Sequence, residues 1–275
     1  MPLTARLIAC FDVKDGRVTK AVQFADNIDV GDPAEVASAV YGDGIDEIIF
    51  YDIMASARRQ GPDLATVEEV AGRVFVPLTV GGGVRDLRDM HAVLDAGAEK
   101  ISLDSMAVRN PQILADGARE FGRQAIVQSM QVKRGPVRPG FPSGYEVWID
   151  GARVAAGLDA VEWAQRGEEL GAGEIVVNSI DADGTQSGFD LGITKLVADA
   201  VSVPVIASGG AGSTGHVAAA FTDAGVSAAI VSSLLYSPRL ARNIPVGELK
   251  EGLAALGLPV RPVGKAAPDP SAQPA

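Results

Sequence analysis

The sequence predicts a single (β/α)8 barrel, the TIM-barrel class of α/β fold, in which eight parallel strands alternate with helices. Three observations predict it. The chain of 275 residues has a usual length for one such barrel. Short apolar runs alternate with amphipathic stretches from end to end, and the runs are apolar on both faces, as buried parallel strands are. The chain also repeats part of its own pattern at about half its length.

The predicted strands are the short apolar runs, which in chain order cover 6–12, 47–52, 76–81, 100–104, 125–131, 174–180, 203–208 and 228–232. Between them, apolar residues recur at helical spacing. The predicted helices cover 32–42, 64–74, 86–96, 111–121, 159–170, 191–201 and 215–224. An open doubly wound sheet would show the same alternation, because alternation alone does not establish that the sheet closes.

The internal repeat favours closure. The segment PLTVGGGVR, which begins at Pro77, is echoed by PVIASGGAG from Pro204. Each is followed by a predicted helix that ends in Ala-Gly and then by a short strand. The spacing is about half a barrel, so the sequence predicts two similar half-barrels.

Residues 1–262 are predicted to form this one barrel, and the Pro-rich residues 263–275 a disordered tail. A polar insertion at 135–151 follows the fifth strand and is predicted to extend over the face where barrel active sites lie. The only cysteine, Cys10, lies in an apolar run and is expected in the core, which fits a reducing compartment. Because no secretory or membrane-spanning segment is evident, we expect a cytoplasmic protein.

The formal net charge of −11 argues against nucleic acid or an anionic membrane as a partner, because both attract basic surfaces. A small anionic ligand is still compatible with this charge if backbone N–H groups bind it. We predict no metal and no cofactor. His91 and His216 fall in predicted helices, no cluster has metal-ligand spacing, and the glycine loops lack the spacing of a dinucleotide site.

Glycine loops leave the third and seventh predicted strands, and serines end the fourth and eighth. Glycine lets the backbone approach a ligand closely, and the start of a helix offers free N–H donors. Two such loops on opposite sides of the barrel would hold a ligand with two phosphates, although each could be only a tight turn.

Three charged residues stand near the ends of the first two strands. Asp12 ends the first strand, where a carboxylate can be a general acid or base or can cap a loop. Asp52 ends the second, where it could orient ligand hydroxyls or cap a loop. Lys20 is predicted on the loop after the first strand, where it could reach a phosphate or lie in solvent.

Four segments together carry a family resemblance: ACFDVKDGRV from Ala9, LTVGGGV from Leu78, GEIVVNSIDADGT from Gly173 and IASGGAG from Ile206. The chain resembles the cyclase subunit of imidazole glycerol phosphate synthase, from histidine biosynthesis, over about residues 3–262. The resemblance implies a lyase and cyclase that uses ammonia from a glutaminase partner on a substrate with two phosphates. Its products would be imidazole glycerol phosphate and an aminoimidazole carboxamide ribotide.

The resemblance assigns catalysis to Asp12 and to the end of the fifth strand, where the family has a second aspartate and this chain has Gln131. Glutamine does not exchange protons at neutral pH, so it would position the ligand or the ammonia. Asp104 stands where the family has an asparagine near one phosphate. An ionised carboxylate there would repel the phosphate unless it protonates or turns away.

The resemblance also implies a charged gate that leads ammonia into the bottom of the barrel. Its members would be Arg6, Glu47, Lys100 and Glu174, which could also be a structural ion-pair ring. The other assignments follow from the strand ends and the resemblance together. Substrate and phosphate binding is assigned to Lys20, Asp52, Gly82, Gly83, Asp104, Ser105, Asn178, Asp183, Gly184, Ser208, Gly209, Gly210, Ser232 and Ser233.

We therefore expect a cyclase-like lyase of this family. The changes at Gln131 and Asp104 leave open a diverged paralogue with another phosphorylated substrate, or a non-catalytic barrel that binds a ligand or activates a glutaminase. A sugar-phosphate isomerase of the related histidine-pathway barrel is a further alternative, but it too would need a second acid.

Overall fold

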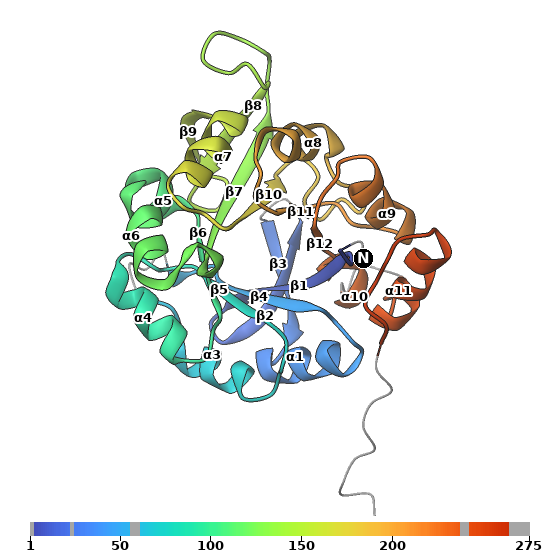
Figure 1. Ribbon diagram of the computed structural model, residues 1–275. Helices are drawn as coiled ribbons and strands as arrows, with labels where there is room; N and C mark the ends of the chain where they lie inside the picture. The colour runs from blue at the N-terminus through green and yellow to red at the C-terminus, as the bar shows by residue number, and fades with distance from the viewer. Residues whose placement is uncertain (1–2, 23–24, 56–60, 237–241, 264–275) are drawn as a thin grey trace, which may run out of the picture.

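Eight parallel strands close into a barrel in the computed structural model, which describes residues 3–22, 25–55, 61–236 and 242–263 (Figure 1). The last strand pairs with the first, with Ala228 opposite Arg6, so the eight barrel strands form a closed ring. Closure confirms the predicted barrel over the open sheet. The strands, in order around the barrel, are β1 (Arg6–Lys14), β4 (Glu47–Asp52), β5 (Leu78–Gly81), β6 (Lys100–Leu103), β7 (Ile126–Arg134), β10 (Glu174–Ser179), β11 (Val205–Ser208) and β12 (Ala228–Ile230).

Helices form the outer ring, and several begin where an aspartate caps the first turn. The Asp32 carboxylate, for example, accepts hydrogen bonds from the backbone N–H groups of Ala34 and Glu35. No helix in the described ranges is long and apolar enough to cross a membrane. The longer helices are α1 (Pro33–Gly42), α3 (Leu64–Ala71), α4 (Leu87–Asp95), α6 (Gln112–Phe121), α7 (Ala160–Glu169), α8 (Leu191–Ala200), α9 (Thr214–Thr222) and α11 (Val246–Ala255).

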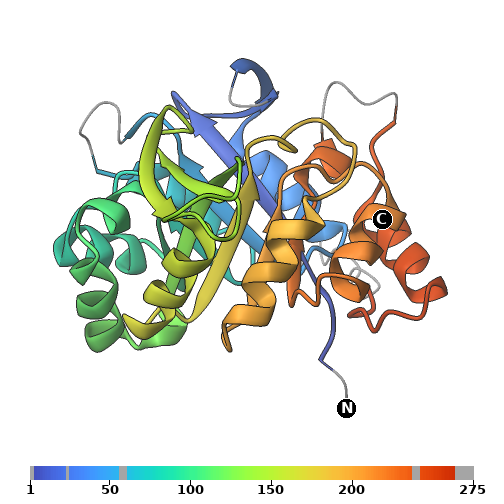
Figure 2. The same cartoon turned by 90° about the horizontal axis from the view of Figure 1, so that it is seen from above.

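A β-hairpin extends the first barrel strand, and the predicted loop placement of Lys20 is wrong. β2 (Arg17–Val22) runs antiparallel to β1 and carries Lys20, and β3 (Ala25–Gly31) pairs with β2. Asp15 and Gly16 connect β1 to β2 with φ values of 52° and 71°. This two-residue Asp-Gly turn suits the twist of a hairpin. Figure 2 shows the hairpin at one end of the barrel and the N-terminus at the other.

The insertion after the fifth strand is a second hairpin. β7 continues to Arg134, and β8 (Tyr145–Ile149) and β9 (Val154–Asp159) add antiparallel strands to it. The turn after β8 is fastened to the barrel rim, because the backbone N–H of Asp150 donates to Ser105 Oγ at 2.9 Å. The insertion is thus built as an extension of the sheet.

Short helices replace the predicted ends of two strands. β6 ends at Leu103, so Asp104 immediately precedes α5 (Ser105–Arg109). β12 ends at Ile230, so Ser232 and Ser233 begin α10 (Ser232–Tyr236) instead of ending a strand. The chain then forms α11, which the sequence pattern missed. Of the predicted tail, residues 263–275, the structure describes only Val263, and the rest lie outside the described residues.

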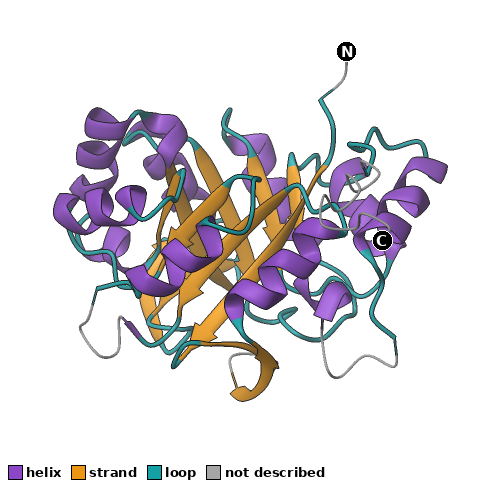
Figure 3. Cartoon of the chain, turned by 90° about the horizontal axis from the view of Figure 1, so that it is seen from below, coloured by secondary structure: helices purple, strands orange, loops and turns teal. Residues whose placement is uncertain are grey.

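The core has two parts. The larger lies between the barrel and the helices, which surround the strands in Figure 3. The smaller fills the barrel interior and includes Ile8, Ile49, Val127 and Val176. Cys10 is buried in this interior cluster, as expected of a core cysteine.

Candidate active site

Asp12, Lys20 and Asp183 form one charged group at the mouth of the barrel. The β1–β2 hairpin sets the first two: Asp12 lies opposite Thr19, whose hydroxyl donates to the Asp12 carbonyl oxygen at 3.0 Å. Asp183 follows β10, and the nearby charges of Asp12 and Asp183 both act on Lys20.

Burial is the main influence on the two carboxylates of this group. It raises the pKa of Asp12, against the opposing effect of Lys20. It raises the pKa of Asp183 to about 6, with Lys20 again opposing. Burial alone would lower the pKa of Lys20, but the two carboxylates outweigh it and the pKa is raised. Lys20 therefore stays cationic, while the pKa of Asp12 is raised above that of an ordinary aspartate, a shift in the direction that favours a role in proton transfer.

Asp104 and Gln131 meet elsewhere on the rim. Gln131 Nε2 donates to Asp104 Oδ2 at 2.9 Å. Burial raises the pKa of Asp104 to about 7, so near neutral pH the carboxyl is substantially protonated. Its protonation and its turn toward Gln131 reduce the repulsion that an ionised carboxylate would exert on a phosphate.

The glycine loops lie on opposite sides of the barrel, after β5 and β11, as the internal repeat predicts. A Cβ on Gly82 would lie 2.2 Å from the Asp52 carbonyl oxygen, and one on Gly210 would lie 2.0 Å from the Gly188 carbonyl oxygen. Their φ values of 87° and 104° also favour glycine. Gly83, Gly184 and Gly209 share this left-handed region, with φ values of 77°, 69° and 85°.

The N-termini of the helices behind these loops are already capped. Asp86 accepts from the N–H groups of Arg88 and Asp89 at the start of α4, and Ser213 accepts from the N–H of His216 at the start of α9. A phosphate at either loop would therefore depend mainly on the N–H groups of the loop itself and on neighbouring segments.

Several assigned residues have a structural partner. Ser232 Oγ accepts from Cys10 N at 2.7 Å and donates to Cys10 O at 3.0 Å, which fastens α10 to β1. Asp52 Oδ1 accepts from the backbone N–H groups of Met54 and Ala55, so it caps the turn after β4. Ser233 is buried at the start of α10, and Ser208 is half-buried at the end of β11.

Arg6, Glu47, Lys100 and Glu174 form a ring at the opposite end of the barrel. Arg6 Nη1 lies 2.6 Å from Glu47 Oε1 and 2.8 Å from Glu174 Oε1. Lys100 Nζ lies 3.3 Å from Glu47 Oε2 and 2.8 Å from Glu174 Oε2. Each cation thus contacts both carboxylates, and the four charges cancel. The ring is mostly buried and closes the N-terminal end of the barrel interior.

Polar side chains inside the barrel escaped the sequence analysis. The Tyr51 hydroxyl lies 3.0 Å from Ser102 Oγ and donates to Ser129 Oγ at 3.3 Å. Alternate residues of a strand face the same side, so Tyr51 faces inward as Glu47 and Ile49 do. This alternation along the strand is the sequence signal that could have placed these side chains in the barrel interior. Asn178, by contrast, was assigned to the site from the sequence, and its Oδ1 is buried and has no hydrogen-bond partner among the described residues.

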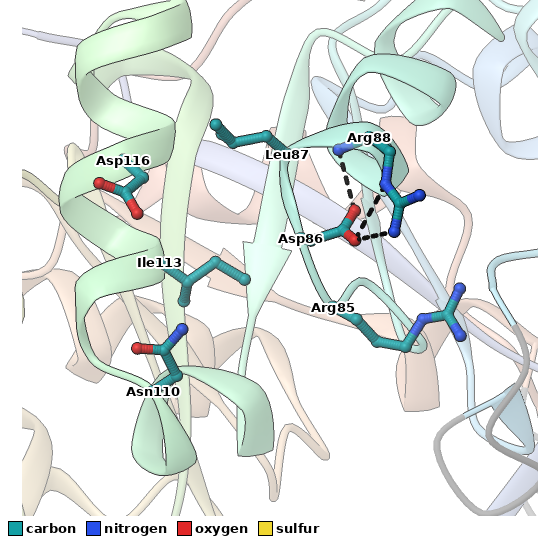
Figure 4. A pocket seen from close by; sticks show the side chains of 7 residues that line it. All are labelled: Arg85, Asp86, Leu87, Arg88, Asn110, Ile113 and Asp116. Atoms are coloured by element: carbon teal, nitrogen blue, oxygen red, sulfur yellow. Dashed lines mark hydrogen bonds and ion pairs between the residues drawn. The ribbon is translucent and has the colours of Figure 1, made fainter.

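A hollow on the outer ring, of about 340 Å³, lies between α4 and α6, away from these groups (Figure 4). Its Arg88 forms an ion pair with Asp86 at 2.7 Å, so this cation already has an anionic partner. In the described part of the chain, no group of three or more His, Cys, Asp and Glu side chains is arranged to hold a metal ion.

Comparison with known proteins identifies a family. Residues 6–241 match the model of a family described as histidine biosynthesis protein. The imidazole glycerol phosphate synthase subunit HisF of Desulfovibrio desulfuricans is 51% identical over 94% of this chain and 98% of its own length. The subunits of the same name from Oleidesulfovibrio alaskensis and Nitratidesulfovibrio vulgaris are 49% and 48% identical, over 94% and 95% of this chain and 98% and 99% of theirs.

Proposed function

The chain belongs to the histidine biosynthesis protein family and, within it, to the HisF subunits of imidazole glycerol phosphate synthase, and we propose that it carries out the cyclase reaction of that synthase. In this proposal ammonia and a phosphorylated ribosyl substrate yield imidazole glycerol phosphate, an aminoimidazole carboxamide ribotide and water. The observation that carries it is 51% identity across nearly the whole of both chains. A cytoplasmic location, where this small-molecule chemistry would occur, is part of the proposal.

The geometry of the mouth supports this reaction. Glycine loops on opposite sides of the barrel suit a long ligand with a phosphate at each end. Because glycine has no side chain, the backbone N–H groups of both loops can come close to a phosphate. Asp12 has a raised pKa and a cationic neighbour, Lys20, that stabilises its charged form. It can therefore accept a proton from ammonia as the new C–N bond forms and return it later.

A glutaminase partner would supply the ammonia at the charged ring. The ring lies at the end of the barrel opposite the proposed catalytic group, and the interior between them is lined by apolar side chains with a few hydroxyl groups. Neutral ammonia can move along such a lining, whereas ammonium would be disfavoured there by desolvation. We propose that the partner docks on the face around Arg6, Glu47, Lys100 and Glu174.

The ring also predicts an effect on stability. Lys100→Met is expected to reduce the free energy of unfolding by roughly 3 kcal/mol, because two buried carboxylates lose a shared cation. Urea unfolding monitored by circular dichroism measures this. Lys195→Met, which removes an exposed pair with Asp199, is the control and is expected to change stability by less than about 0.5 kcal/mol. Equal stabilities of the two variants would show that the ring contributes nothing beyond a surface pair.

The test of the function is reconstitution with a glutaminase subunit from a HisF-containing relative. Glutamine and the bisphosphate substrate are expected to give both products in equal amounts, with one glutamine hydrolysed per turnover. Glutamine hydrolysis without product would contradict the cyclase reaction. If the barrel bound the bisphosphate in that case, a binding or glutaminase-activating role would be favoured, and the absence of both binding and turnover would favour a paralogue with another substrate.

A further inference from the structure

We propose that Asp104 is the second proton-transferring carboxylate of this barrel, acting from the end of β6 in place of a carboxylate at the end of β7. The proposal deepens the cyclase function and rests on it. The resemblance expects an amide at 104 and an acid at 131, and this chain has an acid at 104 and an amide at 131. One acid and one amide are therefore present, with their positions exchanged.

The two side chains are in direct contact, so the exchange moves the acid only a short way. Gln131 Nε2 donates to Asp104 Oδ2 at 2.9 Å. A group that could reach a carboxylate at 131 could reach one at 104 with a small shift of the ligand or side chain. Gln131 is then a positioning residue, because its Nε2–H group orients the Asp104 carboxylate. Its Oε1 is available to accept a hydrogen bond from a ligand.

The unpaired atoms of this pair point to a missing ligand. Asp104 Oδ1, Gln131 Oε1 and Asn178 Oδ1 are all shielded from solvent and have no hydrogen-bond partner among the described residues. Gln131 and Asn178 pair across β7 and β10, so these oxygens come from adjacent parts of the rim. A buried acceptor without a partner is unfavourable, and a ligand with N–H or O–H groups would satisfy these oxygens.

The surroundings of Asp104 suit an acid that gains and loses its proton near neutral pH. Burial raises its pKa to about 7, and the carboxylate of Asp150 after β8 adds to the effect. Arg109 on α5 and the hydrogen bonds from Gln131 and Ser105 act in the opposite direction. Oδ2 accepts the Gln131 hydrogen bond, which leaves Oδ1, the atom with no hydrogen-bond partner among the described residues, to carry the proton toward a ligand.

The proton balance of the reaction then closes with two carboxyl groups. When ammonia adds to a carbonyl carbon, the Asp12 carboxylate takes a proton from the new nitrogen, and protonated Asp104 gives its proton to the carbonyl oxygen, which becomes a hydroxyl group. Asp12 then gives its proton to this hydroxyl group, which departs as water and leaves a protonated imine. Asp104 takes a proton from the imine nitrogen, which restores both groups. Ring closure moves further protons from the ring atoms to the nitrogen of the departing carboxamide ribotide as that C–N bond breaks, and the same two groups pass them in turn.

The test measures ammonium-dependent turnover of the bisphosphate by the natural protein, Asp104→Asn, Gln131→Asp and the double variant. Asp104→Asn is expected to lower kcat by about 10²–10⁴-fold with little change in KM. The double variant, which returns the acid to 131 and the amide to 104, is expected to recover most of that loss. Gln131→Asp alone is expected to give no gain, because two carboxylates in hydrogen-bond contact share one proton.

A pH profile at constant free ammonia separates proton transfer from a structural role. The natural protein is expected to lose kcat as pH rises through about 7, where Asp104 loses its proton, and the residual activity of Asp104→Asn to lack this limb. Asp150→Asn removes a charge that raises the Asp104 pKa, so the limb is expected to move to lower pH. Asparagine suits the left-handed backbone at 150, where φ is 58°.

The proposal is overturned if Asp104→Asn keeps kcat within threefold of the parent, or if the double variant keeps the parent KM but is no faster than Asp104→Asn. Failure of the cyclase function itself is distinguishable. It appears as absence of turnover by the natural protein, before any variant is compared.

Discussion

Asp12→Asn is expected to lower kcat for the ammonium-dependent reaction by about 10²–10⁴-fold, while KM for the bisphosphate stays close to that of the parent. Asparagine keeps the shape of the side chain at the end of β1 but cannot carry a proton. Lys20 would also lose one of the two carboxylates that raise its pKa. Initial rates of ribotide formation measure the effect.

Asp15→Asn is the matched control for that change. Asp15 lies three positions along the chain, is exposed at the β1–β2 turn and has a φ of 52°, which asparagine tolerates well. The same loss of charge at this position is expected to leave kcat within about twofold. A kcat for Asp12→Asn within tenfold of the parent would show that Asp12 does not transfer the proton.

Gly210→Ala is expected to raise KM for the bisphosphate by more than tenfold, which corresponds to about 1.4 kcal/mol of binding free energy. The new Cβ would lie 2.0 Å from the Gly188 carbonyl oxygen at a φ of 104°. The group it would clash with belongs to the backbone, so the loop after β11 must move and its N–H groups leave their positions. Steady-state kinetics with varied substrate measure the change.

Gly225→Ala provides the comparison, because Gly225 also has a positive φ, of 71°, but a Cβ there meets no atom within 4 Å. Its backbone strain is similar in kind and its loop lies outside the proposed phosphate site. It is expected to reduce stability by about 1 kcal/mol and to leave KM unchanged. If both variants kept the parent KM, the Gly210 loop would not hold a phosphate.

Much of the site could be predicted from the sequence because parallel strands bring their carboxyl ends to one rim. That rule is enough to put Asp12, the two glycine loops and Asp104 at the same end of the barrel. The charged ring was predicted from the family resemblance, and its four members do meet: Arg6, Glu47, Lys100 and Glu174. Each is the first residue of its strand, and strand alternation explains why all four side chains face the barrel interior.

The β1–β2 hairpin was missed although its signal was present. Asp15-Gly16 is a strong turn pair, but the alternating barrel pattern favoured a loop between the first strand and the first helix. The contact between Asp104 and Gln131 had no such signal. The last residue of β6, Leu103, pairs with Gln128 of β7, and Gln131 lies three residues further along β7. The sequence register therefore does not place Asp104 next to Gln131, and their contact depends on the directions of the two side chains.

The most direct measurement for the whole account is turnover of the bisphosphate by this chain alone, with saturating ammonium in place of a glutaminase. The account predicts imidazole glycerol phosphate and the carboxamide ribotide in equal amounts, at rates usual for an enzyme of about 1 s⁻¹ or more, despite the glutamine at 131. A protein that binds the bisphosphate but forms neither product under these conditions would contradict it.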